Sequence, residues 1–143
     1  MFAFSAEPID VALLTSQLAR PEAGACITFE GWVRNHNQGQ GVLRLEYEAY
    51  EPLAVKEGEL ILGEAMRKFN VCDAHCVHRV GSLEIGDTAV WVGVTAAHRD
   101  EAYRASRYII DEIKARVPIW KKEHYARGDS GWVNCEQSGS ATA

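Results

Sequence analysis

Alternating hydrophobic and polar residues mark several stretches of this chain as half-buried β-strands. The clearest alternation is Leu-Arg-Leu-Glu-Tyr-Glu-Ala over 43–49, which is typical of an antiparallel strand with one face in the core. Further along the chain, Val90, Val92 and Val94 recur at every second position and are expected to be buried. The predicted strands cover 25–34, 43–49, 71–80 and 88–95.

Apolar residues that recur every three or four positions predict three helices. The first begins at Pro8, because a missing N–H costs nothing at the first helical position. The second is expected to turn Leu62, Met66 and Phe69 toward the core. The predicted helices run from Pro8 to about Ala19, from Glu51 through Phe69, and from 98–100 to about Arg116.

A sharp reversal follows the third helix. Pro118 lacks an N–H and forces the preceding residue into extended geometry, so the helix must end there. In the strand that follows, Lys121 and Glu123 share one face and Lys122 lies on the other. Lys114 and Lys121 therefore flank the reversal, and the chain can bring their ammonium groups to one pocket.

The order of elements is helix, two strands, helix, two strands, helix and one or two strands, the last at Trp132–Val133. Strands in adjacent pairs with short connections favour an α+β fold with a mostly antiparallel sheet over a doubly wound parallel sheet. The polar, glycine-bearing stretch 35–41 is either a hairpin tip or a binding loop. We predict one domain over 1–135 and a disordered polar tail over 136–143.

The net charge of −5 argues against general nucleic-acid binding, which needs a broad basic surface. From 99 to 127, however, eight basic residues face five acidic ones, which suggests either a small anionic ligand or an ordinary solvated helix face. No apolar run approaches the roughly 20 residues that a bilayer requires, and the N-terminus does not resemble a signal peptide. We therefore expect a cytoplasmic protein without a membrane partner.

The four cysteines are expected to be free thiols in a reducing compartment. Cys72, Cys76 and His78 have a spacing that invites a zinc interpretation. In a strand, however, a separation of four residues corresponds to roughly 13 Å, at about 3.3 Å per residue. Two sulfurs so far apart cannot bind one zinc ion, so we predict no metal site.

Two positions are candidates for binding an anion. His98 and Arg99 lie where a strand hands over to a helix N-terminus, whose free N–H groups and positive dipole end attract anions. The alternative is that Asp100 neutralises the dipole while both side chains face water. Arg34, at the end of the first predicted strand, is either a further contact or a solvated strand end.

Lys114 and Lys121 have two interpretations. A lysine that is crowded by other cations has a depressed pKa and can shuttle a proton or act as a nucleophile. Alternatively, Lys114 complements the negative end of the helix dipole and Lys121 is an ordinary strand lysine. Spacing alone does not separate the two.

Four segments, in order between about Ala25 and Val133, together resemble the large, catalytic subunit of molybdopterin synthase. One such segment would be weak support, whereas four in register make chance similarity very improbable. The segments are Gly-Trp-Val-Arg-Asn-His-Asn at 31–37, His-Arg-Val-Gly-Ser-Leu-Glu-Ile-Gly-Asp at 78–87, Val-Gly-Val-Thr-Ala-Ala-His-Arg at 92–99 and Lys-Ala-Arg-Val-Pro-Ile-Trp-Lys-Lys-Glu at 114–123.

The resemblance implies an α/β hammerhead-type fold and a dimer of large subunits, with a small ubiquitin-like sulfur carrier docked on each to form a heterotetramer. The carrier's C-terminal thiocarboxylate enters a pocket of the large subunit. Sulfur then passes to cyclic pyranopterin monophosphate, and two such transfers form the dithiolene of molybdopterin. The resemblance implies neither a cofactor nor a metal.

By position, Lys114 and Lys121 resemble the catalytic lysines of that family. Arg34, His98 and Arg99 resemble the residues that bind the pterin and its phosphate, within one protomer or across the dimer. Phe29 is expected either to line that pocket or to belong to the core.

One departure concerns the C-terminal wall of the site. The family commonly has a basic residue directly before the tryptophan at this point, whereas Gly131 precedes Trp132 here, and Arg127 is a candidate substitute. Two other functions stay open from the residues alone. One is a non-catalytic module that captures the C-terminus of a ubiquitin-like partner, and the other is a domain that binds a phosphate-bearing metabolite.

Overall fold

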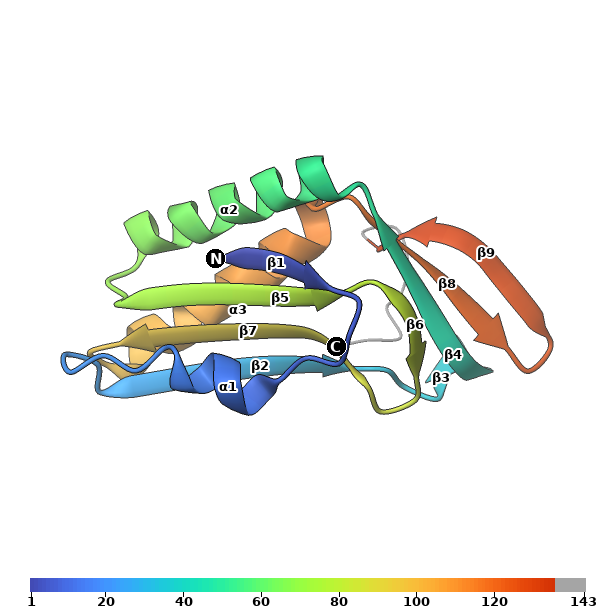
Figure 1. The fold of residues 1–143 in the computed structure, drawn as a ribbon, viewed down its shortest axis with the longest axis horizontal. Helices are drawn as coiled ribbons and strands as arrows, with labels where there is room; N and C mark the ends of the chain where they lie inside the picture. Colours follow the sequence, from blue (N-terminus) through green and yellow to red (C-terminus); the bar gives the residue numbers. More distant parts are fainter. Residues whose placement is uncertain (136–143) are drawn as a thin grey trace.

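The computed structural model describes residues 1–135, which contain the following helices and strands in chain order (Figure 1). They are β1 (Phe2–Ser5), α1 (Val11–Ser16), β2 (Ala25–Trp32), β3 (His36–Asn37), β4 (Gln40–Ala49), α2 (Glu51–Lys68), β5 (Asp73–Arg79), β6 (Gly81–Glu84), β7 (Thr88–Ala96), α3 (Arg99–Arg116), β8 (Ile119–Tyr125) and β9 (Gly128–Asn134). The predicted tail at 136–143 lies outside the described residues.

One sheet has the strand order β1-β5-β7-β2, in which only β1 and β5 run parallel. Helices α2 and α3 cover one face of this sheet, and the short α1 covers the other (Figure 1). Because side chains alternate along β7, Val90, Val92 and Val94 enter the core beneath α2 and α3. Trp91 points the opposite way and packs with Leu18 next to α1.

A second sheet lies at one end of the first (Figure 1). Its strand order is β3-β4-β8-β9, and β6 also pairs with β4. The segment 35–41 is a tight hairpin in which Gln38 and Gly39 both have positive φ, the geometry of a type I′ turn. The predicted α+β class, with three helices and mostly antiparallel strands, is confirmed.

Three local predictions were wrong, and some short strands were missed. The first helix begins at Val11, not at Pro8, because the Asp10 side chain accepts a hydrogen bond from a backbone N–H of the first turn and sets the start. Met66 is 41% exposed, since it lies beside the narrow buried stripe of α2. Leu43 is 59% exposed because a bulge next to it gives its inward place to Val42. Strand β1 was not predicted.

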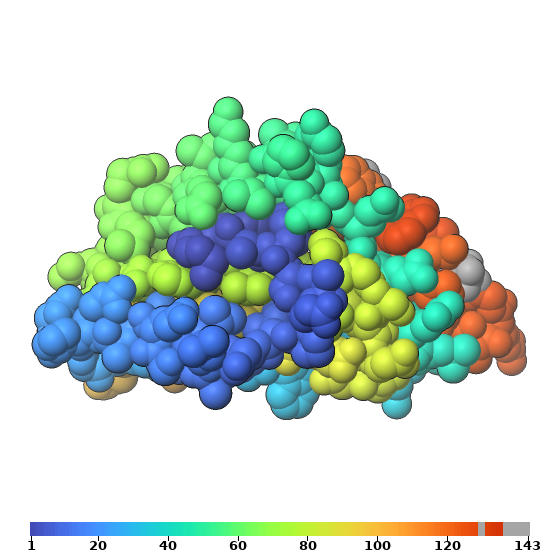
Figure 2. Space-filling view, viewed as in Figure 1, coloured from blue at the N-terminus to red at the C-terminus, as the bar shows by residue number. Residues whose placement is uncertain are grey.

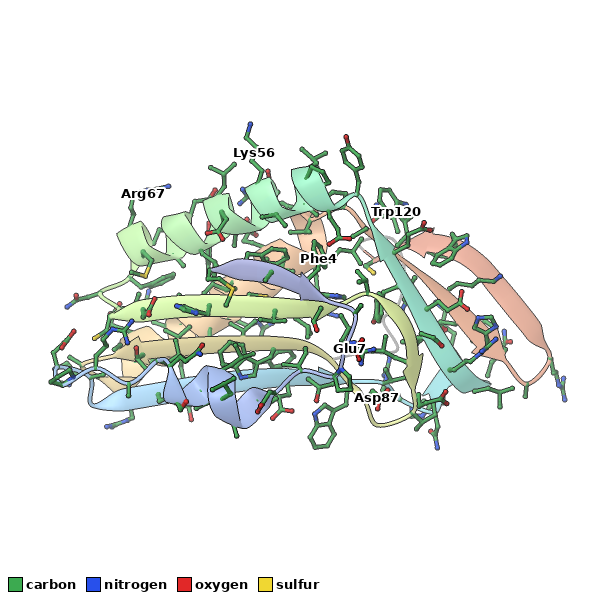
Figure 3. All side chains as sticks on the ribbon, viewed as in Figure 1. Phe4, Glu7, Lys56, Arg67, Asp87 and Trp120 are labelled. Carbon is green, nitrogen blue, oxygen red and sulfur yellow. The ribbon has the colours of Figure 1, made fainter. Side chains whose placement is uncertain are left out.

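Strand β1 packs against α2, and Figure 2 shows this N-terminal segment in dark blue just below the green helix. Lys56 and Arg67 project from the outer side of α2 (Figure 3). The buried residues of this helix are Ala54, Gly58, Ile61, Leu62 and Ala65. The Phe2 ring packs against Gly58, and Glu59 accepts a hydrogen bond of 2.7 Å from the Phe2 N–H. A Cβ on Gly58 would lie 2.3 Å from the Phe2 ring.

The C-terminal end of α3 is tied to α2 by Arg116. Its guanidinium donates to Glu64 at 2.7 and 2.9 Å, to Glu57 at 2.8 Å and to Glu112 at 3.1 Å. The hydrogen bonds that Glu64 itself accepts, from Arg116 and from the Tyr108 hydroxyl, lower its pKa to about 2. The network fixes the last turn of α3, which carries Lys114.

We predict that Gly58→Ala is less stable than Gly63→Ala by about 1–3 kcal/mol in urea unfolding. Both substitutions remove a helical glycine from α2, so the gain in helix propensity is common to both. At Gly58 the new methyl group meets the Phe2 ring, whereas at Gly63 its nearest contact is the flexible end of Arg67 at 3.3 Å. Equal stabilities would show that β1 moves aside without cost.

Candidate active site

The predicted reversal places Lys114 and Lys121 on either side of Pro118. Lys114 lies in the last turn of α3, which ends as predicted with the Val117 N–H donating to Ile113. Strand β8 follows at once, and its side chains alternate between buried and half-buried positions, with Lys121 and Glu123 inside. Lys121 is only 1% exposed, whereas Lys114 is half-buried.

Two other cations, Lys121 and Arg34, lie near enough to Lys114 to act on it electrostatically. The pKa of Lys114 is lowered, first by burial and then by the positive charges of Lys121 and Arg34. Asp111 acts in the opposite direction but is outweighed. Lys114 therefore releases a proton more readily than an ordinary lysine, and the crowded-lysine interpretation gains a physical basis.

Lys121 is held by a buried carboxylate. Its Nζ lies 2.8 Å from Oε1 of Glu123. The Asn37 side-chain amide, at the β3 hairpin, donates to both oxygens of that carboxylate at 2.9 and 3.1 Å, and the Tyr125 hydroxyl donates to Oε2. Glu123 has a lowered pKa, because these hydrogen bonds and the Lys121 charge outweigh its burial. Lys121, Asn37 and Tyr125 thus all hold the Glu123 carboxylate in place.

Lys114 lines two cavities. The first is narrow and mostly apolar, and its polar walls are His78, Tyr47 and Cys135. The second is a wider groove between α3 and β2 that is lined by Phe29, with Arg107 among its charged residues. Phe29 is only partly buried in β2, so the structure places it in the groove wall beside Lys114 as well as against the core.

His78 and Cys135 were not among the predicted site residues, and both carry chemistry-bearing groups at the narrow cavity. Burial, with a contribution from Lys114, lowers the pKa of His78 to about 4, so the imidazole is neutral at physiological pH. Burial raises the pKa of the Cys135 thiol, in spite of the two nearby lysines, so this thiol stays protonated. Neither signal is visible in the sequence, because neither residue is near Lys114 along the chain.

His98 and Arg99 lie elsewhere. Both are exposed at the N-terminus of α3, where His98 is the N-cap residue. Fifteen residues of helix separate Arg99 from Lys114, which is about 22 Å at 1.5 Å per residue. Within one chain the structure therefore does not bring them to the lysine pair. Arg34 is exposed just after β2, and its charge reaches Lys114.

Arg127 does not replace the missing basic residue within its own chain. It lies in the turn between β8 and β9 and lines a separate cavity with Gln40. Lys121 pairs with Val133, deep in the β8–β9 ladder, whereas Arg127 lies beyond the end of β8 at Tyr125.

Among residues 1–135, no three or more histidine, cysteine, aspartate or glutamate side chains form a group able to hold a metal ion. Cys76 is buried in β5, which raises its thiol pKa to about 12. In the same part of the chain, no helix combines the length and the apolar character needed to cross a membrane.

The protein is thus of the α+β class, with Lys114, Lys121 and Arg34 near a helix–strand reversal. The model of the MoaE protein family matches residues 4–116, and the chain belongs to this family. A molybdopterin synthase catalytic subunit from Thermoplasma volcanium is 43% identical over 125 residues, which are 87% of this chain and 89% of the relative. The resemblance seen in the sequence is confirmed.

Solved structures agree. Molybdopterin synthase from Staphylococcus aureus aligns with a TM-score of 0.85 at 39% identity and covers 91% of this chain and 94% of its own. A complex of subunits 1 and 2 of molybdopterin-converting factor from Helicobacter pylori aligns with a TM-score of 0.74 at 20% identity, over 90% of this chain and 87% of its own. The second likeness concerns the fold alone.

We predict that Glu123→Ala lowers the free energy of unfolding by about 3–5 kcal/mol, because it leaves the Lys121 ammonium buried without its carboxylate. Arg107→Ala is the control, since it removes an exposed ion pair with Asp111 and should cost less than about 1 kcal/mol. Adding Lys121→Met to Glu123→Ala should restore part of the loss in urea unfolding. A Glu123→Ala variant as stable as the control would show that water reaches Lys121.

Proposed function

We propose that this protein is the catalytic large subunit of a molybdopterin synthase. It transfers sulfur from the C-terminal thiocarboxylate of a small ubiquitin-like carrier to cyclic pyranopterin monophosphate and so forms the dithiolene of molybdopterin. Family membership supports the activity, since the curated relative from Thermoplasma volcanium is a molybdopterin synthase catalytic subunit. The single observation that carries the assignment of residues is the convergence of Lys114, Lys121 and Arg34.

The two lysines have different tasks in this proposal. Lys121 is a fixed positive charge, because Glu123, Asn37 and Tyr125 hold it in place. It stabilises the thiocarboxylate and the negative charge that develops when sulfur attacks the pterin. Lys114 has a lowered pKa and lines the open groove, so it can donate a proton to the reacting groups and take it back. This difference favours catalysis over a module that only captures a chain end.

The pterin monophosphate is proposed to lie in the groove beside Phe29, with Arg34 near its anionic part. His98 and Arg99 then have to come from a second protomer, since about 22 Å of α3 separates them from Lys114 in their own chain. The active unit in this proposal is a dimer of large subunits with shared sites. A carrier bound to each completes a heterotetramer, and the Helicobacter pylori protein of the same fold is itself in a two-subunit complex.

We predict that Lys114→Ala lowers product formation by about 100-fold or more, while binding of the carrier stays intact. The protein is mixed with thiocarboxylated carrier and the pyranopterin precursor, and molybdopterin is assayed as its fluorescent oxidation product. Lys122→Ala is the matched control, because Lys122 follows Lys121 in β8 but lies on the opposite face of the strand. The activity of this variant should stay close to that of the wild type. Full activity of Lys114→Ala would refute the assignment.

We predict that Arg99→Ala weakens binding of the precursor far more than binding of the carrier, and that it complements Lys114→Ala in mixed dimers. If sites are shared, a mixed dimer has one site with both substitutions and one intact site. Random pairing of equal amounts, achieved by co-expression, then restores about a quarter of the wild-type activity. If each site lies within one chain, co-expression restores none.

A further inference from the structure

The narrow cavity behind Lys114 holds a histidine with a single available nitrogen. His78 lies near the end of β5 and is only 7% exposed. Its Nδ1 is 2.7 Å from the backbone carbonyl oxygen of Arg79. A carbonyl only accepts hydrogen bonds, so Nδ1 carries the proton and Nε2 bears the lone pair. The imidazole is thus fixed as an acceptor on its second nitrogen.

The plane of this ring is fixed as well. The Tyr47 ring lies edge-to-face, with 4.9 Å between centroids and an interplanar angle of 84°. The Phe4 ring lies 6.2 Å away at an interplanar angle of 62°. Phe4 belongs to β1 (Figure 3), and Tyr47 belongs to β4, so elements of both sheets hold the imidazole. Such rigidity is the property expected of a group that orients another.

His78 and Lys114 line the same narrow cavity, and the Lys114 charge acts on the imidazole. Apart from Tyr47 and Cys135, the remaining walls are apolar: Val90, Ile110, Ile113, Val117 and Ile119.

We propose that His78 is a positioning residue: its Nε2 accepts a hydrogen bond from a water molecule that the amino group of Lys114 also binds, and this sets the direction of the amino group at the groove. This inference rests on the proposed catalytic role of Lys114. A neutral acceptor suits the task, because it orients the amino group without cancelling its charge. A carboxylate in the same place would raise the pKa of Lys114, and a cation would repel it.

Two variants separate positioning from packing. His78→Phe keeps an aromatic ring against Tyr47 and Phe4 but has no acceptor, whereas His78→Gln places an amide oxygen near the position of Nε2. We expect kcat to fall about tenfold or more in His78→Phe, with the KM for the precursor and the Kd for the carrier unchanged. We expect His78→Gln to recover most of the lost kcat. An unchanged kcat in His78→Phe, or equal losses in both variants, would overturn the proposal.

A second measurement does not depend on these variants folding. Nitrogen NMR of the wild-type protein at neutral pH should show His78 protonated on Nδ1 only, and Lys114→Met should shift the Nε2 resonance. The proposal would be overturned if Nε2 were protonated, or if the Nε2 resonance did not change in Lys114→Met. Retained activity in Lys114→Ala would instead remove the proposed catalytic role and leave the NMR contact standing, so the two failures are distinguishable.

Discussion

The site depends on one buried ion pair, between Lys121 and Glu123. An ammonium that is 1% exposed is tolerable only if a carboxylate and further hydrogen bonds replace its water. Asn37 and Tyr125 supply those bonds to the carboxylate, so the hairpin at β3 and the strand β8 become parts of one support. With Lys121 fixed as a cation, its repulsion acts on Lys114 and contributes to the lowered pKa there.

The two sheets divide the work of placing these groups. The main core lies between the first sheet and its covering helices and extends into the second sheet, and Arg116 ties the end of α3 to α2. The second sheet carries Lys121 and its carboxylate. Pro118 joins the two, because it ends the helix and begins the strand within a few residues. A scaffold on both sides of this reversal keeps the cations together although they repel one another.

The polar groups around Lys114 differ in charge according to their distance from water. Arg34 is an exposed guanidinium, whereas His78 is buried and neutral. In the proposed reaction, the open groove admits an anionic substrate and the narrow cavity orients the lysine from behind. The length of α3, which carries Arg99 away from Lys114, is the structural ground for proposing that two protomers share each site.

Periodicity and proline chemistry are local, and they sufficed to predict the α+β class, most strand positions and the lysines at the Pro118 reversal. The motifs added the family. The sequence did not reveal that Asn37 holds the partner of Lys121 from 86 residues away, or that His78 shares a cavity with Lys114. Those contacts depend on strand order and on which sheet covers which helix. Only the tertiary structure decides these contacts, because pairing between distant residues produces no periodic pattern in the sequence.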